Sequence, residues 1–385
     1  GILMTTKIQT ILLSEKNNYL KKYHLNAYEL KCYNYMAACG TETFGYNAYE
    51  CEDCGYKLIH YNSCGNRHCP SCQVKSREEW IRKMQSFLLD IPYFHIVFTV
   101  PDSLNDIFLW NKQLMYSLLL KASSQSLLQA AESKYGQIGL TSLLHTWGSN
   151  LWIHPHVHMI VSGGGLTRDN EGNEIFKHSP KNFLLPVKVL SRLFRGKFMD
   201  EMIHLDLHDS YGNQIDFSVE PYQSLISELY HKAWVVYSKE TFGNNQAVLN
   251  YIGRYSHRVA ISNSRILNYD CSSHTVTFRY KDYKDEGKQK EMTLDAIEFI
   301  HRFMMHILPP RFIKIRHYGF MSNSNRKKLL PKCRSLLNQK VHSLQDPEDG
   351  NDTDDTKCRC PQCNGKLILY KFKEVFKPDF RLNSS

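Results

Sequence analysis

The spacing of hydrophobic residues divides the chain into helical and extended segments. Residues 4–36 place apolar side chains at roughly helical intervals, and residues 77–90 place them on a single helical stripe. The run 92–100 is apolar at nearly every position and rich in β-forming residues, which predicts a strand buried on both faces. A second strand is expected at 156–161, ended by the serine and glycines of 162–165.

The rest of the chain continues this alternation, which favours an α+β fold. Helices are predicted at 103–134, 222–239, 246–259 and 294–307, strands at 143–147 and 275–280, and a polar insertion with short strands at 167–220. The expected parts, in chain order, are a helical segment 4–36, a cysteine-rich module 37–76, an α+β domain 77–322 with an insertion at about 167–240, and a tail 323–385.

Charge and composition narrow the class of protein. The net charge is +10, and the segment 346–357 alone carries −5 from six acids and one lysine, so the rest of the chain carries +15. An excess of this size favours a polyanionic partner such as nucleic acid, although a basic enzyme without such a partner is the alternative. The acidic segment itself is predicted to be a disordered linker.

The sequence shows neither a membrane helix nor a signal peptide, and this bears on the expected cellular location. No apolar run approaches the ~18 residues of a membrane helix. The apolar stretch near the N-terminus is too short for a signal peptide, and no small-residue cleavage site follows it. We therefore expect a cytoplasmic protein of bacterial type, associated with the nucleoid.

Cysteine spacing indicates a metal site. The chain has twelve cysteines, and in a reducing cytoplasm clusters of them indicate metal ligands and not disulfides. Cys51 and Cys54 form one CxxC pair, and Cys69 and Cys72 form another after fourteen intervening residues. This is the spacing of a four-cysteine zinc ribbon, in which two hairpins supply the corners of a tetrahedron. Structural Zn²⁺ is predicted at these four thiolates.

Other residues could add ligands. Four of them could hold a second zinc ion, or could be buried thiols and satisfied histidines: Cys39, His60, Cys64 and His68. The tail carries Cys358, Cys360 and Cys363, a pattern similar to half of a zinc knuckle. Its missing ligands could be Cys333 or the N-terminal cluster, or the half-site could stay unfilled.

One predicted strand contains three alternating histidines, His154, His156 and His158. Residues two apart share a face of a strand, so His156 and His158 point the same way while Val157 faces the core. Two imidazoles on one face suit a divalent cation. Because Pro155 cannot donate to a sheet ladder, regular pairing is expected after it, and His154 is the weakest ligand of the three. A row of partly exposed histidines on an edge strand is the alternative.

Two histidines do not complete a metal site, so a third ligand must come from elsewhere in the fold. His95, His145 and His257 are the candidates. His95 lies on the predicted strand 92–100, and it can reach the metal if the two strands are neighbours.

The predicted helix 246–259 carries a pair of tyrosines. Tyr251 and Tyr255 are four positions apart and lie on one helix face, with Arg254 and Arg258 alongside. Taken alone, this spacing is explained as well by amphipathic packing, because the chain has 23 tyrosines.

In combination these features resemble a known family. A cysteine-rich zinc module, a histidine–hydrophobic–histidine strand and a downstream tyrosine helix are similar to the HUH endonucleases, and more closely to the two-tyrosine rolling-circle transposases of the insertion-sequence 91 family. The matching stretches are CEDCG with NSCGNRHCPSCQ (51–73), PYFHIVFTVP (92–101), HTWGSNLWIHPHVHMIVSGGG (145–165), YIGRYSHRVAISNSRI (251–266) and EFIHRFMMHILPPRFIKIRHYGF (298–320). They occur in the family's order over most of 37–320.

The resemblance implies an HUH domain with a ferredoxin-like antiparallel sheet and helices, preceded by the small zinc-binding domain. It implies a DNA transposase that cleaves and rejoins single-stranded or hairpin element ends through a 5′-phosphotyrosine intermediate, with Tyr251 and Tyr255 as nucleophiles. Mg²⁺ or Mn²⁺ would bind at His156 and His158, and Arg254 and the neighbouring Arg258 would contact DNA. Two other functions stay open: a rolling-circle replication initiator or relaxase, and a non-catalytic zinc-ribbon DNA-binding protein.

Overall fold

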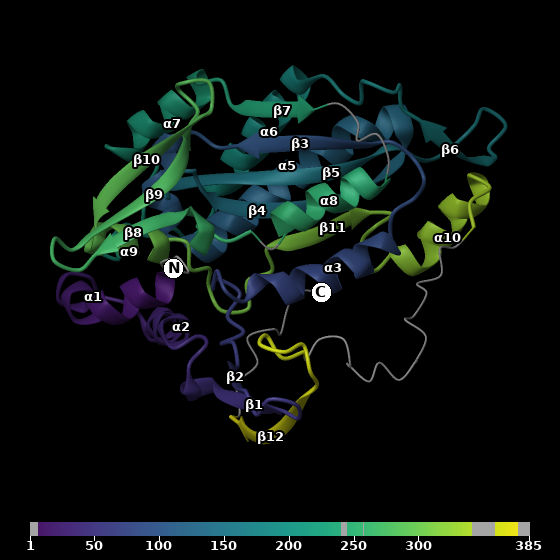
Figure 1. Cartoon of the computed structure of the whole chain (residues 1–385). Helices are drawn as coiled ribbons and strands as arrows, with labels where there is room; N and C mark the ends of the chain where they lie inside the picture. Colours follow the sequence, from purple (N-terminus) through teal and green to yellow (C-terminus); the bar gives the residue numbers. More distant parts are fainter. Residues whose placement is uncertain (1–6, 240–244, 257, 341–358, 376–385) are drawn as a thin grey trace. The chain divides into compact units, whose positions relative to one another are not determined.

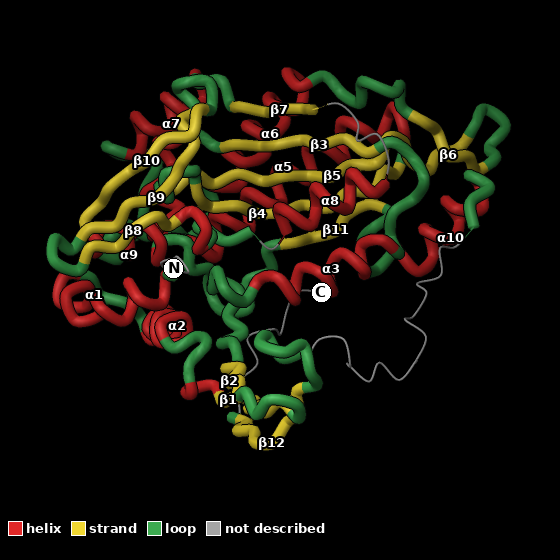
Figure 2. Tube along the Cα trace, in the orientation of Figure 1, coloured by secondary structure: helices red, strands yellow, loops and turns green. Residues whose placement is uncertain are grey.

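The structure is a computed structural model that describes residues 7–239, 245–256, 258–340 and 359–375 (Figures 1 and 2). Among these residues, helices occur together with three sheets in which every strand pair is antiparallel. The predicted α+β class is therefore confirmed. Across the described ranges, no helix has both the length and the apolar character needed to cross a membrane.

The chain divides into two compact units that do not follow the chain order. The first combines described parts of Gly1–Ser76, Val259–Ile307 and Ser343–Leu382, and the second combines those of Arg77–Arg258 and Leu308–His342. The expected continuous domain 77–322 differs from this division, because residues 259–307 pack with the N-terminal region.

A single antiparallel sheet forms the centre of the second unit. Its strand order is β11-β4-β5-β3-β7, and β6 pairs with β5 outside this path. The strands are β3 (Tyr93–Thr99), β4 (Gln137–Trp147), β5 (Ile153–Arg168), β6 (Glu174–His178), β7 (Val235–Lys239) and β11 (Ile315–Gly319). The two strands predicted from the runs 92–100 and 156–161, β3 and β5, are direct neighbours.

Helices cover both faces of this sheet (Figure 2). One face carries α4 (Asn105–Trp110), α5 (Lys112–Tyr135), α6 (Val187–Met202) and α7 (Tyr222–His231). The other carries α3 (Gln73–Gln85), α8 (Asn245–Ser256) and α10 (Arg326–Leu336). The alternation of β5 separates the two layers: Val157 and Met159 belong to the first core, and Ile160 belongs to the second.

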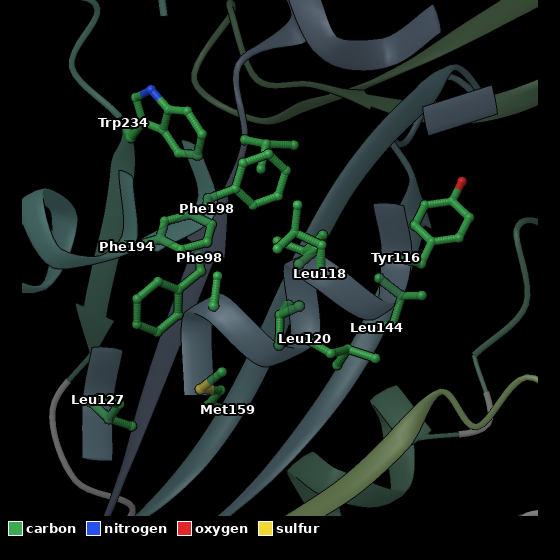
Figure 3. Close-up of a cluster of buried hydrophobic side chains, with 14 of the residues drawn as sticks. Phe98, Tyr116, Leu118, Leu120, Leu127, Leu144, Met159, Phe194, Phe198 and Trp234 are labelled. Atoms are coloured by element: carbon green, nitrogen blue, oxygen red, sulfur yellow. The ribbon is translucent and has the colours of Figure 1, made fainter. Parts of the chain in front are cut away.

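The larger core lies between the sheet and α5 and α6. Figure 3 shows aromatic side chains of α6, Phe194 and Phe198, meeting Phe98 of β3 and the indole of Trp234. Met159 of β5 is buried in the same cluster. This packing fixes β5 from one side and leaves its opposite face, which carries the even-numbered residues, for α8.

Strand β5 is longer than the sequence predicted, because the glycines at 163–165 continue the strand. A Cβ atom on Gly163 would lie 2.8 Å from the carbonyl oxygen of Pro92, and one on Gly165 would lie 2.6 Å from that of Gln137. These glycines allow neighbouring backbone to approach closely, so they are packing positions and not strand terminators.

Two other predictions about this region were wrong. Part of the expected polar insertion is α6, whose residues Leu190, Phe194 and Phe198 bury one stripe at four-residue intervals. The helix expected at 222–239 ends at His231 and is followed by the edge strand β7. The apolar run 184–190, which overlaps the start of α6, predicts one of the short strands expected in the insertion, and the helix period appears only when the later phenylalanines are included.

The first unit contains two small sheets and three helices among its described residues. The sheets have the orders β12-β1-β2 and β10-β9-β8. Their strands are β1 (Gly45–Cys51), β2 (Lys57–Tyr61), β8 (Ile266–Asp270), β9 (Thr275–Asp282), β10 (Lys288–Asp295) and β12 (Leu367–Glu374). The helices are α1 (Ile8–Lys22), α2 (Ala27–Ala37) and α9 (Ala296–Met304), and α1 packs against the other two.

The predicted tail 323–385 is shared between the units. Helix α10 belongs to the second unit, and β12 belongs to the first, where it pairs with β1. The expected acidic linker 346–357 lies outside the described residues.

Candidate functional site

Three histidines gather on one face of the central sheet. His156 and His158 lie on β5, and His145 lies directly opposite His156 on β4. One ring nitrogen from each lies within 4.8 Å of those of the other two. Of the three candidates for a third ligand, the structure therefore groups His145 with the predicted pair. His257 lies outside the described residues.

Hydrogen bonds to the backbone orient two of these rings. Nδ1 of His156 lies 2.7 Å from the carbonyl oxygen of His154, and Nε2 of His145 lies 2.9 Å from that of Tyr255. A carbonyl only accepts, so the nitrogen facing it carries the proton and the other nitrogen of the ring keeps its lone pair. Metal-binding histidines are commonly fixed in this way. The carbonyl that holds His145 belongs to α8, the helix that carries the tyrosines.

Burial keeps these three rings neutral. It lowers the pKa of His156 to about 4, and it lowers the pKa of His145 and His158 well below the usual range, with neighbouring histidines adding to the effect. Neutral imidazole is the form that binds a metal ion. The donor set therefore fits a divalent cation without first having to release protons at neutral pH.

His95 occupies a different place from the one predicted. It is not part of the three-histidine group; its Nε2 lies 3.0 Å from Nδ1 of His158 and 2.5 Å from the hydroxyl of Tyr251. The same hydroxyl lies 3.2 Å from Nδ1 of His158. The strand register explains the difference, since β3 places His95 opposite Ile160, two positions beyond His158.

The two predicted nucleophiles lie beside these histidines. The rings of Tyr251 and Tyr255 stack on each other, with centroids 4.3 Å apart and planes inclined by 24°. The Tyr255 ring is also 4.9 Å from the ring of His158, and the Tyr251 ring is 4.5 Å from that of His95. Burial, with a smaller effect from Tyr255, raises the pKa of Tyr251 above its usual value. Tyr251 is therefore protonated in the resting site.

Of the two arginines predicted to contact DNA, Arg254 lies on α8 and Arg258 lies two residues beyond its end at Ser256. Arg254 and Arg258 are exposed, and the Arg258 guanidinium lies 5.5 Å from the centroid of the Tyr255 ring. Gly253 has a packing role, because a Cβ atom there would lie 2.4 Å from Cδ1 of Ile81 in α3. The glycine lets the two helices approach and so helps to set the position of the tyrosines.

The clustered cysteines form two groups, so the predicted ribbon is wrong in its pairing. The predicted set of Cys51, Cys54, Cys69 and Cys72 is split between them: the first group is Cys39, Cys64, Cys69 and Cys72, and the second is Cys51, Cys54, Cys360 and Cys363. Chain topology explains the split, because the second CxxC pair lies near the end of α2, whereas the first faces the start of β12. The sequence spacing between the two pairs contained no information about either partner.

The first group has the surroundings of a thiolate metal site. Sγ of Cys72 lies 3.5 Å from Sγ of Cys39 and 3.5 Å from Sγ of Cys64. The backbone N–H of Cys64 donates to Sγ of Cys39, and that of Asn66 donates to Sγ of Cys64. Cys39 and Cys64, expected to bind a second ion, thus share one group with a CxxC pair.

The remaining predicted ligands lie elsewhere. Within the described ranges, His60 and His68 belong to none of the groups of clustered ligand atoms. Cys333 is buried in the hydrophobic cluster beneath α10 in the second unit. Cys358 lies outside the described residues. Of the alternatives for the C-terminal cysteines, the structure therefore brings them to Cys51 and Cys54 of the N-terminal region.

Comparison with known proteins gives these sites a family context. Residues 11–100 match a family described as "Transposase zinc-binding domain", and residues 139–328 match one described as "Putative transposase". "Putative transposase y4qJ" of Sinorhizobium fredii is 39% identical over 349 residues, which cover 86% of this chain and 86% of that protein. "Transposase for insertion sequence element IS801" of Pseudomonas savastanoi pv. phaseolicola is 30% identical over 325 residues, or 83% of this chain and 76% of that protein. No solved structure matches the chain.

Proposed function

Because this chain belongs to the insertion-sequence 91 family of transposases, we propose that it cuts and rejoins single-stranded DNA at the ends of its mobile element. The observation that carries the proposal is the contact of the Tyr251 hydroxyl with His158, whose ring also belongs to the three-histidine group. A nucleophile beside three metal-binding imidazoles is the arrangement that metal-assisted phosphoryl transfer requires.

The three-histidine group is the proposed site of the catalytic ion. His145, His156 and His158 would hold Mg²⁺ or Mn²⁺, which would polarise the scissile phosphate and neutralise the charge that develops on it. An all-imidazole donor set binds Mn²⁺ more tightly than Mg²⁺, so the two ions are expected to differ in apparent affinity.

Hydrogen bonding prepares Tyr251 for attack. If Nδ1–H of His158 donates to the tyrosine oxygen, and the tyrosine O–H donates to Nε2 of His95, all three groups are satisfied with one proton each. This arrangement leaves Nε2 of His158 with its lone pair toward the ion. Burial, with a contribution from Lys239, lowers the pKa of His95 to about 4, so its ring is neutral in the resting site and its Nε2 lone pair is free to accept the hydrogen bond from the phenol.

In the proposed step the phenolic oxygen attacks phosphorus in line with the bond to the 3′ oxygen. The bond from tyrosine oxygen to phosphorus forms as the bond from phosphorus to the 3′ oxygen breaks. When Tyr251 attacks, its proton passes to Nε2 of His95, and the departing 3′ oxygen takes a proton from water. The products are a 5′-phosphotyrosine and a free 3′-OH. A phenolate, with a pKa of about 10, leaves more readily than an alkoxide, so a later 3′-OH reverses the step and joins strands.

Two stacked tyrosines suit a reaction with two cleavages. Tyr251 and Tyr255 lie one helical turn apart beside the same histidine, so each hydroxyl can approach a phosphate held there. One tyrosine would keep a strand attached while the other makes the second cut. The exposed side chains of Arg254 on this helix and of Arg258 just beyond its end would bind phosphates of a single-stranded or hairpin end.

A covalent adduct tests the proposal. The protein is incubated with end-labelled single-stranded DNA from the ends of its element and Mn²⁺, and the products are separated on a denaturing gel. We expect a labelled protein–DNA adduct with the wild type and none with Tyr251→Phe/Tyr255→Phe. If the protein binds the DNA, cuts none of it and forms no adduct with any divalent ion, the non-catalytic DNA-binding alternative is correct.

A further inference from the structure

The second cysteine group brings together two segments that are far apart in the sequence: Cys51 and Cys54 near the N-terminus, and Cys360 and Cys363 near the C-terminus. Cys51 lies 3.5 Å from Cys363 and Cys54 lies 3.6 Å from Cys360, measured between Sγ atoms of residues 312 and 306 positions apart. We propose that these four thiolates bind a structural Zn²⁺ of their own, and that this ion fastens β12 to the N-terminal sheet. The matched zinc-binding family region, 11–100, contains only half of this ligand set.

The N-terminal half of the site is a tight CxxC turn. The N–H of Gly55 donates to the carbonyl of Cys51 (3.0 Å), and the N–H of Cys51 donates to the carbonyl of Tyr56 (2.9 Å). Gly55, directly after the second cysteine, has a φ of 70°, a conformation that favours glycine. The amide of Tyr56 also hydrogen-bonds Cys54.

The C-terminal half repeats this turn position by position. The N–H of Asn364 donates to the carbonyl of Cys360 (2.8 Å), and the N–H of Cys360 donates to the carbonyl of Gly365 (2.8 Å). Asn364, at the position equivalent to Gly55, has a φ of 61°. Asparagine is among the few residues that adopt this conformation readily. The amide of Gly365 likewise hydrogen-bonds Cys363. Two matching turns that face each other form the usual framework of a four-cysteine zinc ribbon.

The sulfur separations fit a metal and not a disulfide. With Zn–S bonds of about 2.3 Å, the corners of a tetrahedral site lie about 3.8 Å apart. The two measured separations, 3.5 and 3.6 Å, are close to this value. A disulfide bond would bring two sulfurs to about 2.0 Å.

Burial alone does not hold β12 in place. Of the residues of β12, Leu367 alone is buried, and the other seven are exposed. Among the described residues, the hydrophobic cluster at this sheet has three buried members, Cys51, Cys360 and Leu367, with Tyr49, Tyr56 and Leu58 partly buried against them. Because a core of this size is small for a three-stranded sheet, we expect the free energy of metal binding to contribute to its stability.

Zinc counting tests which cysteines share an ion. The full chain is prepared with His156→Ala, which removes the histidine group as a third place for zinc, and the metal content is measured by mass spectrometry. We expect two zinc ions per chain. Replacing Cys51 and Cys54 with Ser, or Cys360 and Cys363 with Ser, should remove one ion in each case.

Combined variants separate the proposal from the ribbon predicted from sequence. Changing all four residues of the second group should still remove only one ion, whereas adding Cys64→Ser and Cys69→Ser to the C-terminal pair should remove both. Cys271→Ser, at an exposed cysteine outside both groups, is the matched control and should keep two ions. Unchanged zinc after loss of Cys360 and Cys363, or loss of two ions from the second group alone, would overturn the proposal.

A second measurement needs no variant and is independent of folding defects. Native protein is treated with a chelator and an alkylating reagent, and the modified cysteines are identified over time by peptide mass spectrometry. We expect Cys51, Cys54, Cys360 and Cys363 to become reactive together, with one rate constant, in step with release of one ion. If Cys360 and Cys363 are alkylated before any chelator is added as fast as after metal removal, a shared zinc ion is refuted. A linkage that resists the chelator and needs a reductant would identify a disulfide instead.

Discussion

The hydroxyl of Tyr251 lies 2.5 Å from Nε2 of His95, so a histidine outside the three-histidine group holds the proposed nucleophile. On sequence grounds His95, His145 and His257 were all candidates for the third metal ligand. Of these, His95 and His145 have different contacts, and the proposed mechanism gives them different roles: His95 contacts the hydroxyl of Tyr251, and His145 belongs to the group proposed to bind the ion. The difference is open to direct measurement.

Substitution of each histidine should separate these roles. His145→Ala should weaken Mn²⁺ binding by 100-fold or more, roughly the scale of losing a ligand, and should abolish adduct formation. His95→Gln should lower adduct formation through Tyr251 by roughly 10²–10⁴-fold, the usual contribution of a proton acceptor, and change Mn²⁺ affinity by less than about 10-fold. Electron paramagnetic resonance titration measures the affinity. Equal losses of Mn²⁺ affinity in both variants would return His95 to the ligand set.

The period of two along a strand was enough to predict part of this site. It placed His156 and His158 on one face and Val157 in the core, as the structure has them. It could not select His145, because that choice depends on the register between β4 and β5, which is set by packing over the whole sheet.

The prediction of which cysteines share a metal ion was wrong for a related reason. Sequence spacing gave two CxxC pairs near each other, and the nearest partner was the natural choice. The structure separates Cys54 from Cys69, since β12 returns from the far end of the chain and brings Cys360 to the first pair. Contacts of such long range depend on tertiary pairing, about which local spacing carries no information.

The glycines of β5 should be intolerant of a side chain. Gly163→Ala would place a Cβ atom 2.8 Å from the carbonyl oxygen of Pro92, a backbone atom that cannot rotate away. We expect a loss of about 1–3 kcal/mol in the free energy of unfolding. The control is Gly196→Ala in α6, where a Cβ atom meets open space and should stabilise the helix by up to about 1 kcal/mol. Urea unfolding measures both, and equal effects would contradict the close packing of the strand.

Glu15 should make the first unit sensitive to acid. Burial alone would raise the pKa of this carboxyl, but hydrogen bonds from Tyr269, Asn18 and His274 outweigh burial and lower it. A lowered folded-state pKa means that ionised Glu15 stabilises the fold above the unfolded value of about 4.3, and that this contribution is lost as the pH falls through the folded pKa.

Melting temperatures measured from pH 3 to 8 test whether the stabilisation by Glu15 is lost as the pH falls. Glu15→Gln should melt below the wild type at neutral pH, with a loss of roughly 1–3 kcal/mol for hydrogen bonds to a buried charge. The difference in melting temperature between the variant and the wild type should disappear as the pH falls below about 4. Glu291→Gln, at an exposed position of β10 in the same unit, should show no such difference. A difference that widens toward acid would contradict the direction of the pKa shift.

The two tyrosines should be partly interchangeable in the first cleavage and both required for the complete reaction. Phe keeps the ring, and so the stack between Tyr251 and Tyr255, while removing the hydroxyl. We expect each single Phe variant to reduce complete transposition strongly, at least one to form a covalent adduct on a single-stranded end, and the double variant to form none. A melting temperature of each variant within about 2 °C of the wild type would show that the substitution removed the hydroxyl without destabilising the fold. For a chain of this size, a change of about 1 kcal/mol in the free energy of unfolding shifts the melting temperature by about that much.

Peptide mapping identifies the attacking residue. Arg254 lies between the tyrosines, so trypsin places Tyr251 and Tyr255 on different peptides, and the DNA-linked peptide reports which one attacked. In Tyr251→Phe the adduct should move entirely to the peptide of Tyr255, and it should no longer respond to His95→Gln, because the hydroxyl that contacts His95 is gone. An adduct on any other tyrosine, or one that persists in the double variant, would show that α8 does not carry the nucleophiles.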